Sequence, residues 1–430
     1  MKAAFLTLGC KVNQYETEVM TEQLQANGFE IVAAGEKPDV LVINSCTVTE
    51  ESSRKVCQLL RRYRRLLPGA MLVLTGCMPQ AFPEAAGALS EADIVLGNTR
   101  RANLLPAVLE FLDSHERILR ISPHETDEAF ERSVISGFSG HTRAFLKIED
   151  GCNRFCSYCI IPYARGRVRS KPMEDIRREA SLLTGRGFRE IVLVGINLSA
   201  FGSERGETLV DAVEEVSQVD GVSRIRLGSL EPDLLTEEVI GRLATIPSFC
   251  PQFHISLQSG CDETLLRMNR RYNTAFYRGI VQSIRRHFDY PAVTTDIMVG
   301  FPGETEQEFS ASLRFAEEIS FAKAHVFSYS MRPGTRASGF DAQVPAGVKA
   351  ERSRRMIELT SRTRREFLSA QMGRMCSVLL EQPAGNGNLE GYTENYTPVR
   401  IRASEALCGQ TVDVKITAAE DDFCAGVLIK

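Results

Sequence analysis

The sequence contains no apolar run of the roughly 18 residues that a membrane-spanning helix requires. Its first residues turn polar too soon for a secretory signal peptide, and no internal repeat or low-complexity segment is evident. These absences exclude collagen-like, mucin-like and wholly disordered chains as well as membrane-spanning ones. We expect a protein without a membrane partner that is located in the cytoplasm.

An excess of positive charge is also missing. The chain has 51 Lys and Arg residues against 55 Asp and Glu residues, a formal net charge of −4. A protein that binds nucleic acid through its overall charge is therefore disfavoured, although a local basic face is not. A helix near residues 349–374 carries eight Lys and Arg residues against three Glu residues. This pattern fits either a solvated helix face or a contact with a polyanion.

What the chain does contain is enough residues for several folded units. Its 430 residues correspond to two to four domains at roughly 100–200 residues each. A hydrophobic fraction of 43% and a charged fraction of 25% are ordinary for a globular protein.

Residues 1–125 alternate short apolar runs with amphipathic helical stretches. The predicted strands are residues 3–8, 40–43, 71–74 and 94–96. Strands that alternate with helices indicate an open parallel α/β sheet, in which sites form at the carboxyl ends of the strands. Because Cys10, Cys46 and Cys77 each come just after one of these strands, we expect them to converge on one edge of this domain.

Residues 126–142 are polar and lack periodicity, so we interpret them as a linker. A second α/β series follows over residues 142–370. Its predicted strands are residues 144–148, 190–194, 224–227, 252–257, 292–299 and 324–329. Six such units predict an incomplete parallel (β/α)6 barrel rather than a second open sheet. Residues 371–430 alternate like β-hairpins instead, which predicts a small C-terminal β-barrel.

The twelve cysteines are the most informative part of the composition. In a reducing compartment they favour metal ligation or thiol chemistry over a disulfide framework. Only Cys152, Cys156 and Cys159 are tightly clustered, directly after the first predicted barrel strand. Soft thiolates select an iron–sulfur cluster or zinc, and no fourth ligand for zinc appears in the pattern. Three ligands on a four-iron cluster leave one iron free to bind a small molecule.

The wider string GCNRFCSYCIIPYARGRVRS (residues 151–170) resembles the radical S-adenosylmethionine methylthiotransferases. The segments TLGCKVNQYE, NSCTVT and TGC, which contain the three N-terminal cysteines, are similar to the N-terminal domain of that family. SLQSG (residues 256–260) and GFPGET (residues 300–305) are similar to its barrel. GYTENY (residues 391–396) resembles the TRAM β-barrel that follows. The resemblance extends over essentially the whole chain.

This resemblance implies an enzyme that places a methylthio group on an unactivated carbon, which protein acid–base groups cannot do alone. It is closest to the branch that modifies carbon 2 of N6-threonylcarbamoyladenosine beside the anticodon of tRNA. Isopentenyl-adenosine in tRNA and an aspartate of a small-subunit ribosomal protein remain alternative substrates. The last alternative gains weight from residues 371–430, where five Lys and Arg residues stand against eight Asp and Glu residues. An RNA-binding barrel should be basic.

The resemblance also implies two [4Fe-4S] clusters and S-adenosylmethionine as cofactors. Cys152, Cys156 and Cys159 would hold the cluster that binds S-adenosylmethionine. Cys10, Cys46 and Cys77 would hold an auxiliary cluster that carries the inserted sulfur. The expected partners are the anticodon loop of tRNA and an electron donor such as flavodoxin or ferredoxin.

Further residues are expected to contact the cofactor or the RNA, and no general acid or base is assigned. The cofactor candidates are Tyr158, Gly195, Asn197, Glu231, Gln258, Gly300 and Gly303. Basic side chains and aromatic rings suit phosphates and unpaired bases, respectively. The RNA candidates are Arg165, Arg167, Arg169, Lys171, Arg362, Arg364, Arg365, Tyr392 and Tyr396.

Overall fold

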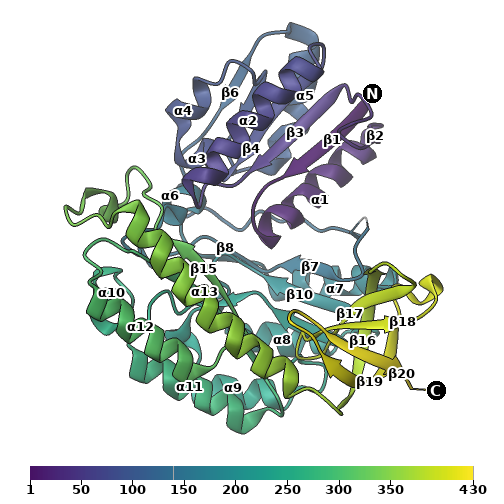
Figure 1. Cartoon of the computed structure of the whole chain (residues 1–430). Helices are drawn as coiled ribbons and strands as arrows, with labels where there is room; N and C mark the ends of the chain where they lie inside the picture. Colours follow the sequence, from purple (N-terminus) through teal and green to yellow (C-terminus); the bar gives the residue numbers. More distant parts are fainter. Residues whose placement is uncertain (139, 430) are drawn as a thin grey trace.

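The protein is described here by a computed structural model that covers residues 1–138 and 140–429. Three assemblies of strands follow one another along the chain, and Figure 1 shows the N-terminal sheet above a larger β/α assembly with the C-terminal barrel at its side. Within these residues, none of the helices combines the length and the apolar character needed to cross a membrane.

The N-terminal sheet is fully parallel, with the strand order β2-β1-β3-β4-β5-β6. Its strands are β1 (Lys2–Thr7), β2 (Glu30–Ile31), β3 (Val40–Ser45), β4 (Met71–Gly76), β5 (Ile94–Leu96) and β6 (Ile118–Arg120). Helices cover both faces, which is why β3 and β4 are continuous apolar runs. One face packs against α1 (Lys11–Ala26) and α5 (Leu104–Ser114), the other against α2 (Glu50–Leu66), α3 (Cys77–Ala81) and α4 (Pro83–Gly87). The predicted open parallel sheet is confirmed.

The central assembly consists of two parallel sheets, β11-β10-β7 and β12-β13-β14-β15. Their strands are β7 (Ala144–Lys147), β10 (Glu190–Val194), β11 (Arg224–Leu227), β12 (Ser229–Leu230), β13 (Gln252–Ile255), β14 (Ala292–Val299) and β15 (Lys323–Ser328). Only Gly228 separates β11 from β12, so these two segments act as one strand that joins the two sheets. Counted in this way, the assembly is an incomplete barrel of six strands. This agrees with the predicted (β/α)6 architecture.

Helices surround this barrel, and the largest apolar core of the protein lies between them and the strands. They are α7 (Met173–Gly185), α8 (Leu209–Ser217), α9 (Glu237–Ala244), α10 (Asp262–Arg267), α11 (Thr274–His287), α12 (Glu306–Ile319) and α13 (Ala346–Ser369). The loop that follows β7 contains the short antiparallel pair β8 (Glu149–Asp150) and β9 (Arg169–Ser170), with α6 (Ile161–Arg165) between them.

The C-terminal strands close into a barrel in the order β16-β17-β18-β20-β19. They are β16 (Met375–Pro383), β17 (Asn388–Thr393), β18 (Pro398–Arg402), β19 (Thr411–Ala419) and β20 (Cys424–Leu428). The predicted small β-barrel is therefore confirmed. The segment 126–142, expected as a linker, contains no helix or strand among its described residues. Ser139, within it, lies outside the described part.

Candidate active site

The three clustered cysteines lie on the loop between β8 and α6, where the backbone is tightly held. Gly151 has φ +91°, and a Cβ there would lie 1.9 Å from the carbonyl oxygen of Arg167. The Cys152 N–H donates to the carbonyl of Gly166 at 3.0 Å, and the Cys159 N–H donates to that of Cys156 at 2.9 Å. These bonds help to fold the loop, whose three thiols lie close enough to interact electrostatically.

Burial makes two of these thiols, those of Cys152 and Cys159, hard to ionise on their own. It raises the pKa of Cys152 to about 12, and the nearby Cys156 thiol adds to this effect. The pKa of Cys159 is raised by burial and by Cys156 in the same way. Cys152 and Cys159 therefore need a cation or a metal to stay thiolates, which is the situation of a metal-binding site before it is loaded.

The three N-terminal cysteines converge at the carboxyl edge of the first sheet. Cys10 precedes α1, Cys46 follows β3, and Cys77 begins α3 after β4. A Cβ on Gly9, which has φ +125°, would lie 3.1 Å from the Cβ of Cys46. Burial raises the pKa of Cys77 to about 12, and both other thiols raise it further. The structure thus brings together the triad that strand position predicted.

Each triad has one buried arginine that donates to a sulfur. Arg165 Nε lies 3.2 Å from Sγ of Cys77, and Arg270 Nη1 lies 3.3 Å from Sγ of Cys156. Guanidinium donors stabilise anionic sulfur, so both triads fit a thiolate-ligated group. Arg270 was missed at the sequence level because it follows α10, far from the cysteines in sequence.

Neither triad resembles a site for a single ion. In residues 1–138 and 140–429, no three His, Cys, Asp or Glu side chains form a group that could hold one metal ion. In a four-iron cluster each thiolate binds a different iron, so its ligands are spaced more widely than those of zinc. The set of three thiolates in each triad therefore fits the larger group.

Two of the expected cofactor residues lie beside the barrel triad. Glu231 forms an ion pair with Arg270 at 2.7 Å, so Arg270 bridges this carboxylate and the Cys156 sulfur. Tyr158 packs edge-on against Phe301, with ring centroids 6.4 Å apart. Their contact with S-adenosylmethionine remains a prediction.

Three buried oxygens near the strand ends have no hydrogen-bond partner among the described residues. They are Oε1 of Glu149, Oδ1 of Asn197 and Oε1 of Gln258. The other Glu149 oxygen accepts the Asn197 N–H at 2.7 Å, and a Cβ on Gly195 would lie 2.7 Å from it. Unpartnered buried oxygens are costly unless a ligand satisfies them, so this region fits a polar cofactor such as S-adenosylmethionine.

Gly300 and Gly303 occupy tight turns after β14. Both have left-handed backbones, with φ +68° and +78°, and a Cβ on Gly300 would lie 2.4 Å from Cγ of Lys349. The Gly300 N–H donates to Glu304 at 2.7 Å. The turn itself explains these glycines, and their approach to a cofactor stays a prediction.

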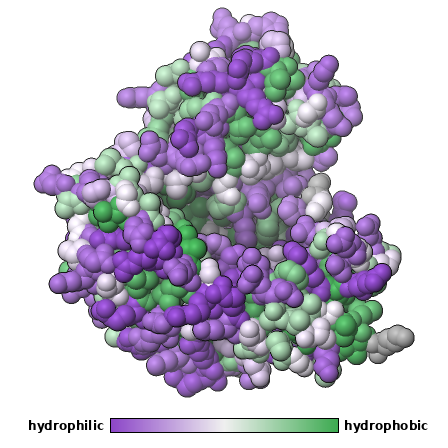
Figure 2. Space-filling view, viewed as in Figure 1, coloured by the Kyte–Doolittle hydropathy of each residue, from purple (hydrophilic) through white to green (hydrophobic). Residues whose placement is uncertain are grey.

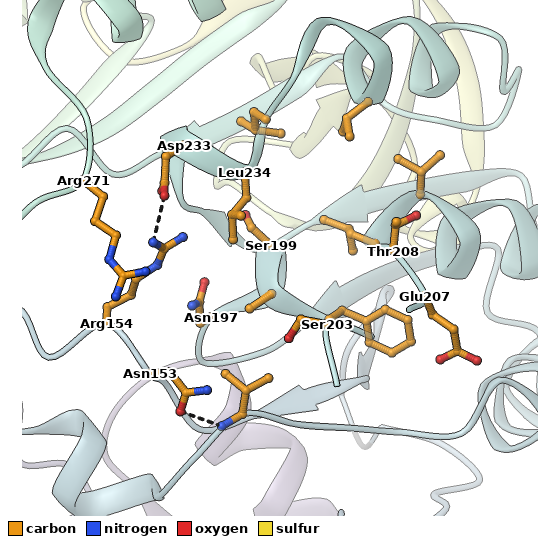
Figure 3. Close-up of a pocket in the computed structure, with 17 residues that line it drawn as sticks. Asn153, Arg154, Asn197, Ser199, Ser203, Glu207, Thr208, Asp233, Leu234 and Arg271 are labelled. Carbon is orange, nitrogen blue, oxygen red and sulfur yellow. Dashed lines mark hydrogen bonds and ion pairs between the residues drawn. The ribbon is translucent and has the colours of Figure 1, made fainter. Parts of the chain in front are cut away.

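A cavity of about 470 Å³ opens beside the cysteine loop of the barrel (Figure 3). Asn153 and Arg154 of that loop line one end, where Arg154 forms an ion pair with Asp233 at 2.8 Å. In Figure 3, Asn197 lies between Arg154 and Ser203. Of the expected cofactor residues, Asn197 is the one that lines this cavity.

A second cavity, of about 390 Å³, is shared by all three parts of the chain. Cys10 lines it from the N-terminal domain, Gly195 from the end of β10, and Tyr396 from the C-terminal barrel. Figure 2 shows a hollow between the upper and lower parts of the molecule. A member of the auxiliary triad and an expected cofactor residue therefore border one space.

The structure corrects the expected RNA contacts of Arg165, Arg169 and Lys171. Arg165 is 0% exposed and paired with Glu16, and Arg169 is buried among Glu128 and Asp150. Lys171 is fully buried against Glu179. These cations neutralise buried carboxylates, so no phosphate can reach them. Arg167 is the exposed arginine of this run.

The two tyrosines of the C-terminal barrel stack on each other rather than standing free. The ring centroids of Tyr392 and Tyr396 are 4.4 Å apart at an interplanar angle of 14°. Arg143 lies against both rings and donates to the Tyr396 hydroxyl at 2.8 Å. Stacking of either ring on an RNA base stays a prediction.

The basic helix α13 presents its three candidate arginines differently. Arg362 is exposed and paired with Glu317, and Arg365 is exposed. Arg364 is mostly buried and forms an ion pair with Asp422 at 3.1 Å. Part of the positive charge on this face is therefore neutralised within the protein.

Comparison with known proteins agrees with this geometry. Residues 2–97 match the family described as Uncharacterized protein family UPF0004, and residues 146–316 match the radical SAM superfamily. The chain is also similar to the radical S-adenosylmethionine methyltransferase TsrM of Kitasatospora setae. That solved structure has a TM-score of 0.58 at 14% identity and covers 78% of this chain and 73% of its own. This likeness concerns the fold alone.

Relatives cover almost the full length. Threonylcarbamoyladenosine tRNA methylthiotransferase MtaB of Bacillus subtilis is 36% identical over 99% of this chain and 96% of its own. The tRNA-2-methylthio-N(6)-dimethylallyladenosine synthase of Pelotomaculum thermopropionicum is 32% identical over 99% and 97%. The barrel fold and the triad of Cys152, Cys156 and Cys159 define a radical S-adenosylmethionine enzyme. The chain belongs to the radical S-adenosylmethionine methylthiotransferase family.

Proposed function

We propose that this protein methylthiolates carbon 2 of N6-threonylcarbamoyladenosine beside the anticodon in tRNA. The observation that carries this proposal is the 390 Å³ cavity, in which Cys10 of the auxiliary triad meets the strand ends of the barrel. The enzyme needs a space where one base can reach both the sulfur donor and the radical cofactor. Relatives named for this substrate reach 36% identity.

The residues fit two [4Fe-4S] clusters, one on each triad. When bound, the barrel cluster with S-adenosylmethionine supplies the one-electron chemistry that removes hydrogen from carbon 2, and the auxiliary cluster supplies the sulfur. The chain's own groups bind and orient these cofactors. Arg165 donates to a sulfur of the N-terminal triad, and Arg270 donates to a sulfur of the barrel triad.

The remaining partners follow from this activity. Arg167, Arg362 and Arg365 are the exposed arginines of the candidate set, and we assign them to tRNA phosphates. A flavodoxin or ferredoxin would deliver electrons to the barrel triad, and the cytoplasm is where tRNA substrate is found. We also propose that the chain divides into three domains, which comprise residues 1–125, 142–370 and 371–430.

A direct test uses the reconstituted enzyme with S-adenosylmethionine, a chemical reductant and three substrates. These are tRNA carrying threonylcarbamoyladenosine, tRNA carrying isopentenyl-adenosine, and the small-subunit ribosomal protein. We expect nucleoside mass spectrometry to find the methylthio product from the first tRNA. Product from only the second or third substrate would replace the proposed function by that alternative.

A further inference from the structure

The cavity shared by the three parts of the chain is lined by several cationic side chains. Lys11, Arg143, Arg226 and Lys323 line it, together with His254 and His325, whereas Asp296 is the carboxylate among its lining residues. The apolar lining comes from Val12 and from valines of β10. A cavity built to take a purely apolar side chain would not gather cations in this way.

Most of these charges already have partners. Arg226 pairs with Glu190 at 2.6 Å, and Arg143 pairs with Glu381 at 2.7 Å. His254 lies 3.2 Å from Asp296. These groups are therefore fixed within the protein and are not free to neutralise a ligand.

Lys11 differs from them. It forms no ion pair with any residue in the described part of the chain, its side chain is exposed to the cavity, and both Arg143 and Arg226 repel it. Glu190, which attracts Lys11, is already paired with Arg226. Lys11 is therefore a site of positive potential that an anionic ligand group would relieve. Lys11 also directly follows Cys10, so this potential lies beside the auxiliary triad.

The proposed substrate has an anion at the matching place. Its threonyl carboxylate is linked to adenine through a urea on N6. The outer urea N–H can close a six-membered hydrogen-bonded ring onto N1, which neighbours carbon 2. This fold brings the carboxylate to the carbon-2 side of the base, where sulfur is inserted. The isopentenyl group has no charge and needs no such partner.

We infer that Lys11 binds the threonyl carboxylate of the substrate base and is a specificity-determining residue of this enzyme, an inference that rests on the proposed function. Lys323, the other cavity lysine without an ion pair in the described residues, interacts instead with Arg364 and Asp422 near the C-terminal barrel. It lies on β15, far from Cys10 in sequence.

The test compares two anticodon stem-loops that differ only in the threonyl carboxylate and its uncharged carboxamide. We expect Lys11→Gln to lower kcat/KM on the carboxylate substrate by about 10- to 100-fold, the range of a charged hydrogen bond, and to leave the carboxamide substrate unchanged. Lys11→Arg should restore most of the preference. Lys55→Gln, at an exposed lysine of α2, is the matched control and should behave as wild type.

Equilibrium binding of both stem-loops to the holoenzyme gives a second readout, and iron content checks that the neighbouring triad stays loaded. If Lys11→Gln lowers kcat/KM equally on both stem-loops, Lys11 stabilises the fold or contacts the RNA backbone. If the variant prefers the carboxylate over the carboxamide as strongly as wild type does, Lys11 does not contact the carboxylate. Either result overturns the inference while the proposed function stands. A wild-type enzyme that acts only on isopentenyl-adenosine would overturn both.

Discussion

Arg165 Nε donates to Sγ of Cys77 at 3.2 Å, while the same guanidinium binds the carboxylate of Glu16. Arg165 ends α6, six residues after Cys159, and Cys77 lies at the edge of the N-terminal sheet. One buried side chain therefore links the loop of the barrel triad to a cysteine of the other triad. Rigid spacing between the two is what transfer of sulfur to a carbon radical requires.

The first prediction concerns this link. Replacing Arg165 by Met removes one of the three cations paired with the buried Glu16, and losing one charged hydrogen bond costs about 1.5–3 kcal/mol. We expect the free energy of unfolding of the apo-protein, measured with denaturant, to fall by that order. The iron bound by the N-terminal triad should fall as well.

Arg167→Gln is the matched control, because Arg167 is exposed two residues away. Its effect should stay within about 0.5 kcal/mol, as for ordinary surface substitutions. If the two variants are equally stable, the buried ion pair does not hold the domains together.

The second prediction concerns alanine substitutions at two glycines. It distinguishes the steric clash of an added Cβ from the strain of a left-handed backbone. Gly151 and Gly187 both have left-handed backbones, with φ +91° and +97°. A Cβ at Gly151 would clash with the Arg167 carbonyl, whereas no described atom lies within 4 Å of a Cβ at Gly187. Gly151→Ala should therefore lose the iron of the barrel triad, and Gly187→Ala should keep it and lose about 1 kcal/mol. Full iron loading of both variants would contradict this account of the loop.

The fold was largely predictable because its signals are local. Buried strands such as β3 and β4 are continuous apolar runs. The C-x₃-C-x₂-C spacing by itself predicts the loop that contains the barrel triad. The edge strands β2 and β6, of two and three residues, are too short to give a pattern. Long-range pairings were not predictable. Arg165 and Lys171 look like surface cations in sequence, and only the fold reveals their partners Glu16 and Glu179.

The third prediction follows from the ionisation of Glu16. Burial opposes its charge, yet Arg101, Arg165 and Lys147 together lower its pKa to about 2. In the unfolded chain a Glu side chain titrates near pH 4.3. The stabilisation is therefore complete above about pH 4.3 and is lost as the pH falls towards 2. Acid unfolding of the apo-protein should show this loss, and Glu16→Gln should flatten the profile between those pH values while lowering stability at pH 7.

The fourth prediction separates the two triads. Replacing Cys152, Cys156 and Cys159 by Ala should remove about half of the iron and abolish reductive cleavage of S-adenosylmethionine, because we propose that this triad holds the cluster whose open iron binds the cofactor. Replacing Cys10, Cys46 and Cys77 should leave cleavage intact and stop thiolation. Iron analysis and detection of deoxyadenosine and methylthio products measure both effects. Methylthio product from the second variant would show that the N-terminal triad is only structural.

The last prediction concerns the tRNA surface of α13. Arg362 is half exposed and Arg365 is exposed, whereas Arg364 is held by Asp422 against the C-terminal barrel. Removing one arginine–phosphate interaction lowers the slope of log affinity against log salt by about 0.9, or less on single strands. The double change of Arg362 and Arg365 to Gln should therefore flatten the slope by up to about two units, measured by tRNA binding at several salt concentrations. Arg364→Gln should leave the slope unchanged, because its side chain is mostly buried beside the C-terminal barrel and is less accessible to phosphate. An unchanged slope in the double variant, with tight binding to the basic ribosomal protein, would favour the protein-modifying alternative instead.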